Sequence, residues 1–276
     1  MSQPIVVITG ASTGIGLGAA RELIRRGYTV YGSVRKVDDG SRLQQELGAA
    51  FHPLYFDVTD GVAVGRATAE VSRALGGAPL AGLINNAGVA VNGPIEELSI
   101  DEIKYNFEVN VFGLLRTTKA FLPLLKAGKK GEPAGRILNI SSVSGKLVAP
   151  FMGPYSGTKF AVEAFSHAMR REFDRFGIKV VIIGPGPIET PIWNKANLQA
   201  FEKSVYIDSL RKFFRKFAGD ASRRMSLEEF STRMADIFEN PSPRSRYTIT
   251  KGKFMNFTLP TLLPDNMVDN FFKKLM

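Results

Sequence analysis

Cysteine is absent from this sequence of 276 residues, which has only two histidines and one tryptophan. Without cysteine the chain can form neither disulfides nor thiolate metal sites, and it has no thiol nucleophile. The two histidines, His52 and His167, lie far apart in the sequence and lack the spacing of metal ligands. We therefore expect no metal site.

Long apolar runs are also missing. No stretch approaches the ~20 apolar residues that a membrane-spanning helix needs. The N-terminus enters a short apolar segment at Pro4–Thr9, with no basic region followed by a long apolar one. These absences indicate a soluble, cytoplasmic protein.

The composition is that of a globular protein, with 44% hydrophobic and 22% charged residues. This is enough for one large α/β domain over residues 1–276, and no linker-like stretch suggests a second. The net charge is +10, and part of the excess lies between Lys195 and Arg224. Such a segment is either a solvated helix face or a surface for anionic lipid, an acidic substrate such as an acyl-CoA, or nucleic acid. No nucleic-acid-binding module accompanies it.

A glycine-rich loop follows the first predicted strand. Ile5–Ile8 is an unbroken apolar run, as in a parallel strand buried on both faces. It leads into Thr9-Gly-Ala-Ser-Thr-Gly-Ile-Gly16 and then into a helical pattern that stops at Gly27. Strand, glycine turn and helix N-terminus together predict a phosphate cradle for a dinucleotide. The alternative is an ordinary tight turn, because the glycine spacing differs from the commoner G-x-G-x-x-G.

The second predicted strand, Tyr28–Val34, ends in Arg35-Lys36. The residue after this strand faces the adenosine ribose, where a carboxylate suits NAD and an arginine suits the 2′-phosphate of NADP. No carboxylate occurs before Asp38, so the sequence favours NADP(H). Otherwise Arg35 and Lys36 merely begin a surface loop.

Further strands and helices alternate along the chain. Apolar strands are predicted at 51–56, 80–84, 136–142, 179–183 and 246–250, and helices at 41–47, 60–75, 99–125, 155–176 and 226–238. This rhythm predicts a doubly wound parallel sheet of about seven strands with helices on both faces. Ligands bind at the carboxyl ends of such strands, where Gly10, Asp57 and Asn86 would lie.

Tyr155 and Lys159 are spaced four residues apart on the predicted helix 155–176, so they share one face. An ammonium near a phenol favours the phenolate, and such a tyrosine can exchange a proton with a substrate oxygen. Ser142, after an apolar run, could donate a second hydrogen bond to that oxygen. Taken alone, a tyrosine and lysine at this spacing also occur as surface residues.

Together these motifs resemble the short-chain dehydrogenase/reductase family, whose members have a single-domain Rossmann fold. The resemblance covers residues 4–190 and rests on the order of Thr9–Gly16, Asp57, Asn85–Gly88, Asn110, Ser142, Tyr155, Lys159 and Pro185–Thr190. It implies that Tyr155 is the general acid/base, that Lys159 binds the nicotinamide ribose and lowers the phenol pKa, and that Ser142 orients the substrate oxygen. Asn110 is implied to hold a water that links Lys159 to solvent.

The resemblance also implies a cofactor site. Asp57 and Val58 contact adenine, Asn86 to Gly88 line the centre of the site, Ile188 and Thr190 hold the carboxamide, and Thr13 helps to bind a 2′-phosphate. The full implied set is Gly10, Ser12, Thr13, Gly14, Ile15, Gly16, Arg35, Asp57, Val58, Asn86, Ala87, Gly88, Tyr155, Lys159, Pro185, Gly186, Ile188 and Thr190.

Within the family, the chain is most similar to the branch of hydroxysteroid and retinol dehydrogenases. It departs from many of them at Gly184, where they often carry glutamate. The resemblance places a helical substrate lid at about 191–225, where aromatic residues such as Trp193 and Phe213 suit a bulky apolar substrate or simply pack the lid. An extension at about 251–276 is rich in Phe and Leu, and it could close the pocket, form a subunit interface or rest on a membrane surface.

These features predict an NADP(H)-dependent carbonyl reductase or alcohol dehydrogenase for a bulky hydrophobic substrate of steroid, retinoid or long-chain type. The alternatives are a 3-oxoacyl thioester reductase and a non-catalytic, NADP(H)-binding regulatory protein. The family commonly forms homodimers or homotetramers through the Tyr-bearing helix and its neighbour.

Overall fold

The computed structural model describes residues 3–126, 134–190, 198–218 and 224–273. In this part of the chain one sheet of seven parallel strands has the order β3-β2-β1-β4-β5-β6-β7. The strands are β1 (Ile5–Ile8), β2 (Thr29–Val34), β3 (Phe51–Tyr55), β4 (Gly82–Asn85), β5 (Arg136–Ile140), β6 (Lys179–Pro185) and β7 (Arg246–Ile249). The predicted parallel sheet is confirmed. Strand β5 ends two residues early because Ser142 instead caps the 3₁₀ turn Val143–Gly145.

The strand order reverses direction at β1, in the middle of the sheet. Val7 of β1 pairs with Tyr31 of β2 on one side and with Leu83 of β4 on the other. The connections after β1 and β4 therefore run to opposite sides of the sheet. Such a switch point leaves a crevice at the carboxyl ends of the two strands, which is where α/β sheets bind ligands.

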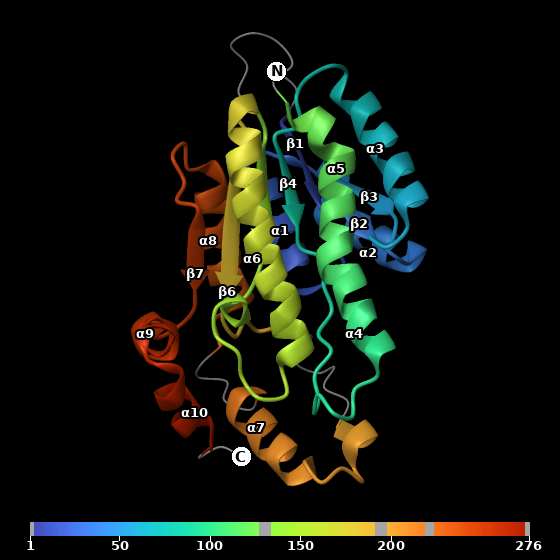
Figure 1. Cartoon of the computed structure of the whole chain (residues 1–276). Helices are drawn as coiled ribbons and strands as arrows, with labels where there is room; N and C mark the ends of the chain where they lie inside the picture. Colours follow the sequence, from blue (N-terminus) through green and yellow to red (C-terminus); the bar gives the residue numbers. More distant parts are fainter. Residues whose placement is uncertain (1–2, 127–133, 191–197, 219–223, 274–276) are drawn as a thin grey trace.

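Helices cover both faces of the sheet (Figure 1). One core layer contains Leu23, Leu43 and Phe230, from α1 (Gly14–Arg25), α2 (Val37–Leu47) and α8 (Leu227–Glu239). The other contains Val71, Phe121 and Val162, from α3 (Gly61–Leu75), α5 (Gly113–Leu125) and α6 (Gly153–Phe173). Helix α2 begins four residues before the predicted start, with Asp38 and Asp39 in its first turn, where carboxylates favour a helix N-terminus.

The predicted helix 99–125 is not one regular α-helix, because a π-helical segment interrupts it. The capping box of Ser99 and Glu102 opens α4 (Ile100–Phe107), as the sequence predicts. A π-helical segment, Glu108–Phe112, then joins α4 to α5 and carries the buried Asn110. Single π-helical turns are often found at functional sites, because they turn a side chain away from the regular helical positions.

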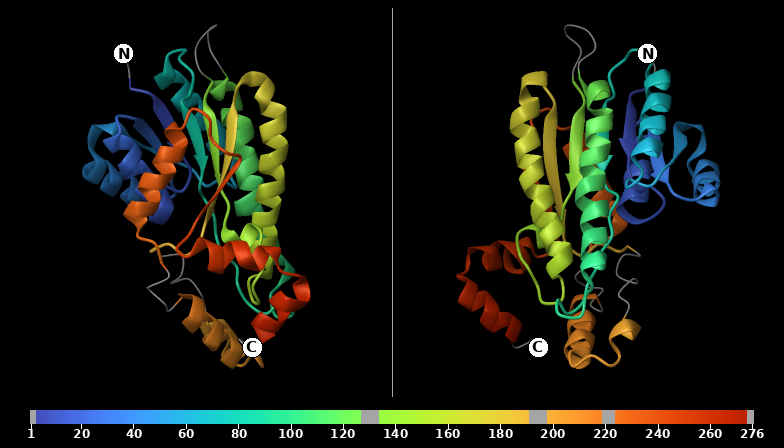
Figure 2. Two further views of the ribbon diagram at one scale, coloured as in Figure 1. Left: turned by 90° about the vertical axis from the view of Figure 1, so that its left-hand side faces the viewer. Right: turned by 45° about the vertical axis from the view of Figure 1, so that its right-hand side comes forward.

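Two helical segments lie beyond the carboxyl edge of the sheet, below the arrowheads of β4 and β6 in Figure 1. The first comprises a 3₁₀ turn at Leu198–Phe201 and α7 (Ile207–Ala218); the second comprises a π-helical turn at Phe254–Thr258, α9 (Leu259–Leu262) and α10 (Asp265–Lys273). Figure 2 shows both from two further sides. Trp193 and Lys195 of the predicted lid lie outside the described residues. Among the described helices, none has the length and apolar character that crossing a membrane requires.

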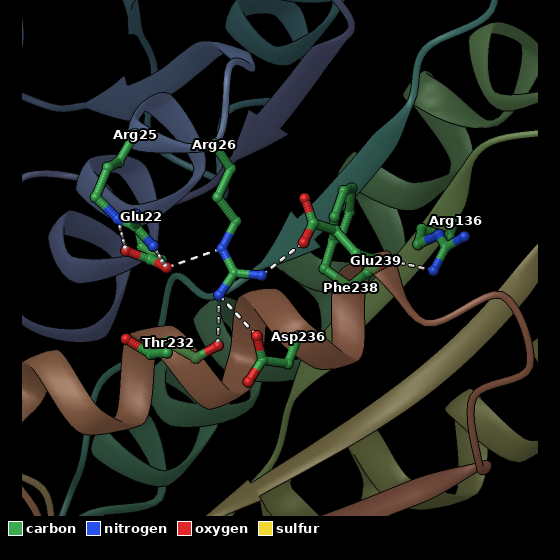
Figure 3. A network of polar contacts seen from close by, with 8 residues as sticks. All are labelled: Glu22, Arg25, Arg26, Arg136, Thr232, Asp236, Phe238 and Glu239. Carbon is green, nitrogen blue, oxygen red and sulfur yellow. Dashed lines mark hydrogen bonds and ion pairs between the residues drawn. The ribbon is translucent and has the colours of Figure 1, made fainter.

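A cluster of charged residues holds α1 and α8 together (Figure 3). The guanidinium of Arg26 donates to Glu22 at 2.8 Å, to Asp236 at 2.7 Å and to Glu239 at 2.5 Å. The helices also touch closely, because a Cβ on Gly18 would lie 2.3 Å from the Ser231 hydroxyl. Helix α8 thus braces the helix whose N-terminus follows the glycine-rich loop.

Candidate functional site

The glycine-rich loop between β1 and α1 has the backbone that the sequence predicts. Gly10 and Gly14 have φ angles of +68° and +57°, which L side chains rarely adopt. A Cβ on Gly16 would lie 2.2 Å from the Gly10 carbonyl oxygen, so the first turn of α1 packs directly on the loop. Thr13 at the N-cap makes no side-chain capping bond in the described structure. The first N–H groups of α1 are therefore available to an anion, as the pyrophosphate of a dinucleotide requires.

The loop after β4 is tied to the glycine-rich loop. The Thr9 hydroxyl accepts from the backbone N–H groups of Asn86 and Ala87, at 2.9 and 3.0 Å. The Asn86 amide donates to the carbonyls of Thr9 and Gly10. Asn86 thus shapes the cradle through its side chain, and Ala87 and Gly88 follow it along the crevice.

The adenosine end of the predicted site contains Arg35 and Asp57. They follow β2 and β3, and the Arg35 Nη1 lies 3.7 Å from the Asp57 Oδ2, with 64% of the Arg35 side chain exposed. The side chain of Val58 is buried against Gly113. Val58 can therefore contact the adenosine end of the site only through its backbone. Arg42 of α2, which sequence reasoning missed, donates to the carbonyl of Ser12 at 2.9 Å.

The structure brings Ser142, Tyr155 and Lys159 together beside the end of β5. Ser142 follows this strand, and its hydroxyl accepts from the Ser144 N–H. Ser142 also acts to lower the pKa of Tyr155, so the two side chains lie near each other. Lys159 is 5% exposed. Its Nζ donates to the Ile140 carbonyl at 2.9 Å and lies 5.6 Å from the centre of the Tyr155 ring.

The electrostatics of these residues differ from the expectation that Lys159 makes the phenol more acidic. Burial raises the pKa of Tyr155, and the hydrogen bond with Ser142 opposes that rise only in part. Burial also lowers the pKa of Lys159 to about 8, while the Glu163 carboxylate acts to raise it. The expected lowering of the Tyr155 pKa is absent from this structure, because desolvation outweighs the other influences on the phenol.

Asn110 is 2% exposed, and the groups of its side chain amide all have protein partners. Its Oδ1 accepts from the Val89 N–H, and its Nδ2 donates to the Val89 carbonyl and to the Thr158 hydroxyl, at 2.8 to 3.0 Å. The amide therefore joins the loop after β4 to α6. The proton relay through a water at Asn110 stays a prediction.

The segment after β6 reaches the glycine-rich loop. The Gly186 N–H donates to the Ile249 carbonyl at 2.9 Å, and a Cβ on Gly186 would lie 2.1 Å from the Thr250 hydroxyl. Ile188 is 2% exposed. Thr190 lies beside Gly14, whose Cβ would meet its side chain at 3.4 Å. Pro185 to Thr190 therefore runs from the end of β6 to the glycine-rich loop, and its contact with a bound nicotinamide stays a prediction.

An apolar cluster lies against Tyr155. Phe151, Met152, Leu210, Phe213 and Phe214 are buried, and Tyr155 packs against them. Phe151 adopts a φ of +64°, which is unusual for a residue with a large side chain. Its ring makes edge contacts with Phe213 and Tyr206, with centroids 5.8 and 6.2 Å apart. The surroundings of the phenol are thus apolar and aromatic.

Sequence reasoning also missed Glu163 and Arg246, which form a buried ion pair behind Ser142. Glu163 follows Lys159 by four residues, so its place on the same helix face could have been read from the spacing. Arg246 lies 83 residues farther along the chain. No local pattern marks it.

Comparisons with known proteins agree with the fold. A family model described as "short chain dehydrogenase" matches residues 4–200. An NADPH-dependent 3-dehydrocapnine reductase of Ornithobacterium rhinotracheale is 36% identical over 270 residues, which are 97% of this chain and 95% of the relative. A short-chain dehydrogenase structure from Streptomyces avermitilis is 27% identical, with a TM-score of 0.78 over 100% of this chain and 95% of that one. An alcohol dehydrogenase of Thermococcus sibiricus, complexed with 5-hydroxy-NADP, is 25% identical, with a TM-score of 0.72 over 91% and 97%.

Proposed function

This chain belongs to the short-chain dehydrogenase/reductase family and is a carbonyl/alcohol oxidoreductase, and we propose that it uses NADP(H) to reduce a bulky hydrophobic carbonyl compound. The observation that carries this proposal is the meeting of Ser142, Tyr155 and Lys159 beside a glycine cradle at one edge of the sheet.

The residues present fit a bound dinucleotide. The glycine-rich loop and the free N–H groups of α1 would hold the pyrophosphate, Lys159 the nicotinamide ribose, and Ile188 and Thr190 the carboxamide. NADPH, when bound, supplies the hydride that reduces the carbonyl carbon. The chain's own part is to position the substrate, exclude water and supply the proton.

Tyr155 is proposed to give its phenolic proton to the substrate oxygen as the alcohol forms. Ser142 would donate a hydrogen bond to the same oxygen and so orient it. The raised pKa of Tyr155 fits this direction, because the phenol is then protonated at neutral pH and ready to act as an acid. After proton transfer the buried Lys159 ammonium would stabilise the phenolate.

Arg35 supports the preference for NADP(H). Its side chain is largely exposed at the end of β2, and the Asp57 carboxylate lies near it at 3.7 Å. A guanidinium in this place can pair with a 2′-phosphate and stack on adenine. The relative named above is NADPH-dependent, and the T. sibiricus enzyme binds 5-hydroxy-NADP.

The apolar cluster around Phe151 and Phe213 supports a bulky hydrophobic substrate, of steroid, retinoid or long-chain type. The test follows NADPH absorbance with a panel of steroids, retinal, aliphatic aldehydes and 3-oxoacyl thioesters. Preferred turnover of the thioesters would favour the alternative of a 3-oxoacyl thioester reductase. The Tyr155→Phe variant should lose turnover and still bind NADPH. If no member of the panel is turned over and NADPH binds, the non-catalytic alternative is favoured.

We also infer a homodimer or homotetramer. Ile100, Tyr105, Phe112, Phe160 and Phe165 are exposed on α4, α6 and the π-helical segment between α4 and α5. Part of this face forms a hollow of about 660 Å³, lined by residues such as Ile103 and Phe107. A second copy would cover these apolar side chains, and sedimentation equilibrium would measure the resulting mass.

The segment 251–273 has its own apolar surface. Phe254, Met255, Leu262 and Met267 are between 51% and 74% exposed, whereas Phe257 is buried. Contact with a membrane surface is the proposal that this exposure supports beside a subunit interface. Co-sedimentation with anionic vesicles, lost on deletion of residues 265–276, would support it, and no binding at low salt would exclude it.

A further inference from the structure

A buried ion pair lies directly behind Ser142. Glu163 of α6 and Arg246 of β7 have side chains that are 3% and 15% exposed. The Arg246 Nε donates to both carboxylate oxygens of Glu163, at 3.0 and 2.9 Å. Because the two residues come from distant parts of the chain, the pair joins the helix of Tyr155 and Lys159 to the last strand of the sheet.

Both members of the pair also bind the chain at the end of β5. The Ser141 hydroxyl donates to the Glu163 Oε1 at 2.7 Å, and the Arg246 Nη2 donates to the Ser142 carbonyl at 3.2 Å. The backbone that carries the Ser142 hydroxyl is therefore held on two sides. A shift of about 1 Å in such a group can cost about 100-fold in rate.

The pair fills its space tightly. A Cβ on Gly184 would lie 2.6 Å from the Arg246 Nη2, so this residue must be glycine if the guanidinium is to keep its place. The Phe257 ring covers the guanidinium from the C-terminal segment, with 5.2 Å between the Arg246 Cζ and the ring centre. Replacing a buried ion pair by apolar groups is often neutral or stabilising, so stability alone does not account for one built so closely around Ser142.

Several charged groups surround Glu163. Lys159 precedes it by one turn on α6, Tyr155 by two turns, and His167 follows it by one turn; Arg246 faces it from β7, and the Lys146 Nζ lies 3.8 Å away on the loop after β5. Lys159 is buried, and its pKa is lowered by that burial and raised by the Glu163 carboxylate. The carboxylate thus opposes the loss of charge that burial imposes on Lys159.

We propose that Glu163 and Arg246 are positioning residues for the proposed reaction: together they fix the backbone of Ser142, and the Glu163 carboxylate keeps Lys159 in its charged form. This inference rests on the proposed function and adds two residues to it. Arg246 has a further part, because its guanidinium holds the Glu163 carboxylate in place.

The first test needs neither substrate nor cofactor. The side chains of lysine are labelled with ¹³C, and the Lys159 signal is identified by its loss in Lys159→Met. In Glu163→Gln, which keeps the size of the side chain, we expect Lys159 to titrate at lower pH than in the wild type. Glu172→Gln is the matched control, because Glu172 is exposed near the end of the same helix. An unchanged Lys159 titration in Glu163→Gln overturns the electrostatic part of the proposal.

The second test measures kcat, with NADPH and the best carbonyl substrate of the panel. Glu163→Gln, Arg246→Lys and Gly184→Ala should each lower kcat by about tenfold or more, with the KM for NADPH little changed. In Glu163→Gln the decline of kcat at high pH should also begin at lower pH. If kcat falls only in proportion to the fraction of unfolded protein, measured by circular dichroism, the pair is structural and the proposal is wrong.

These experiments distinguish a failure of the proposed function from a failure of the positioning role of Glu163 and Arg246. Turnover retained in Tyr155→Phe would overturn the proposed function. Loss of turnover in Tyr155→Phe together with wild-type kcat and Lys159 titration in Glu163→Gln would overturn this inference alone.

Discussion

The nucleotide side and the catalytic side of the sheet's carboxyl edge are held by different means. On the nucleotide side, glycines at 10, 14 and 16 and backbone groups of Asn86 and Ala87 fit together with almost no charge. On the catalytic side, a buried carboxylate and a guanidinium from separate elements pair with each other and bind Ser141 and the Ser142 carbonyl. The first region should therefore be sensitive to added atoms, and the second to lost charge and lost hydrogen bonds.

The largest effect should come from Tyr155→Phe. Removal of the phenolic oxygen takes away the proton donor, so kcat should fall by at least about 10²- to 10⁴-fold. The Kd for NADPH, measured by fluorescence, should remain near that of the wild type. This variant would show that the catalytic side can fail while the nucleotide side stays intact.

Gly16→Ala should do the reverse. The added Cβ would lie 2.2 Å from the Gly10 carbonyl oxygen, and backbone atoms cannot move away as a flexible side chain can. We expect a loss of about 100-fold in NADPH affinity, because the cradle must open to accept the methyl group. Gly65→Ala is the control, since no atom of the described residues lies within 4 Å of its Cβ position. Wild-type affinity in Gly16→Ala would contradict the close packing of this loop.

Arg35→Ala tests the one charged contact proposed for the nucleotide side. The loss of a charge-assisted hydrogen bond to the 2′-phosphate, worth about 1.5–3 kcal/mol, should raise the Kd for NADPH by about tenfold or more. The Kd for NADH should change little, because NADH lacks that phosphate. Equal effects on both cofactors would mean that Arg35 does not recognise the 2′-phosphate.

The smallest effect should come from the α1–α8 contact, which belongs to neither side. Hydrogen bonds from Arg25 and Arg26 lower the pKa of Glu22 from its ordinary value of 4.5 to about 2. Since the folded-state pKa is depressed, this contribution to stability is present above about pH 4.5 and is lost as the pH falls towards 2. Urea unfolding of Glu22→Gln should therefore show a shallower loss of stability across this pH range than the wild type. Identical slopes would contradict the prediction.

The same contrast explains how much the sequence could predict. The sheet, the cradle and the helix of Tyr155 and Lys159 could be predicted from short-range patterns. These are the apolar runs, the spacing of the glycines, and the four-residue spacing of Tyr155 and Lys159. The π-helical turn around Asn110 was not predicted, because apolar periodicity does not distinguish it from a regular helix. Arg246 was missed because its role depends on its contacts with Glu163 and Gly184. These residues are distant in the sequence, and only the strand order brings them beside Arg246. The raised pKa of Tyr155 depends on burial, which comes from tertiary packing that no local pattern reports.

The clamp between α1 and α8 has a consequence for synthesis on the ribosome. Arg26 and Asp236 are separated by 210 residues, so the helix that braces the cradle is translated long after the cradle itself. Until then, the apolar face of α1 that packs with Phe230 and Met234 has no permanent cover. This exposed apolar face could cause the nascent chain to aggregate. We therefore expect chaperones to bind the apolar face of α1 until the chain is released from the ribosome.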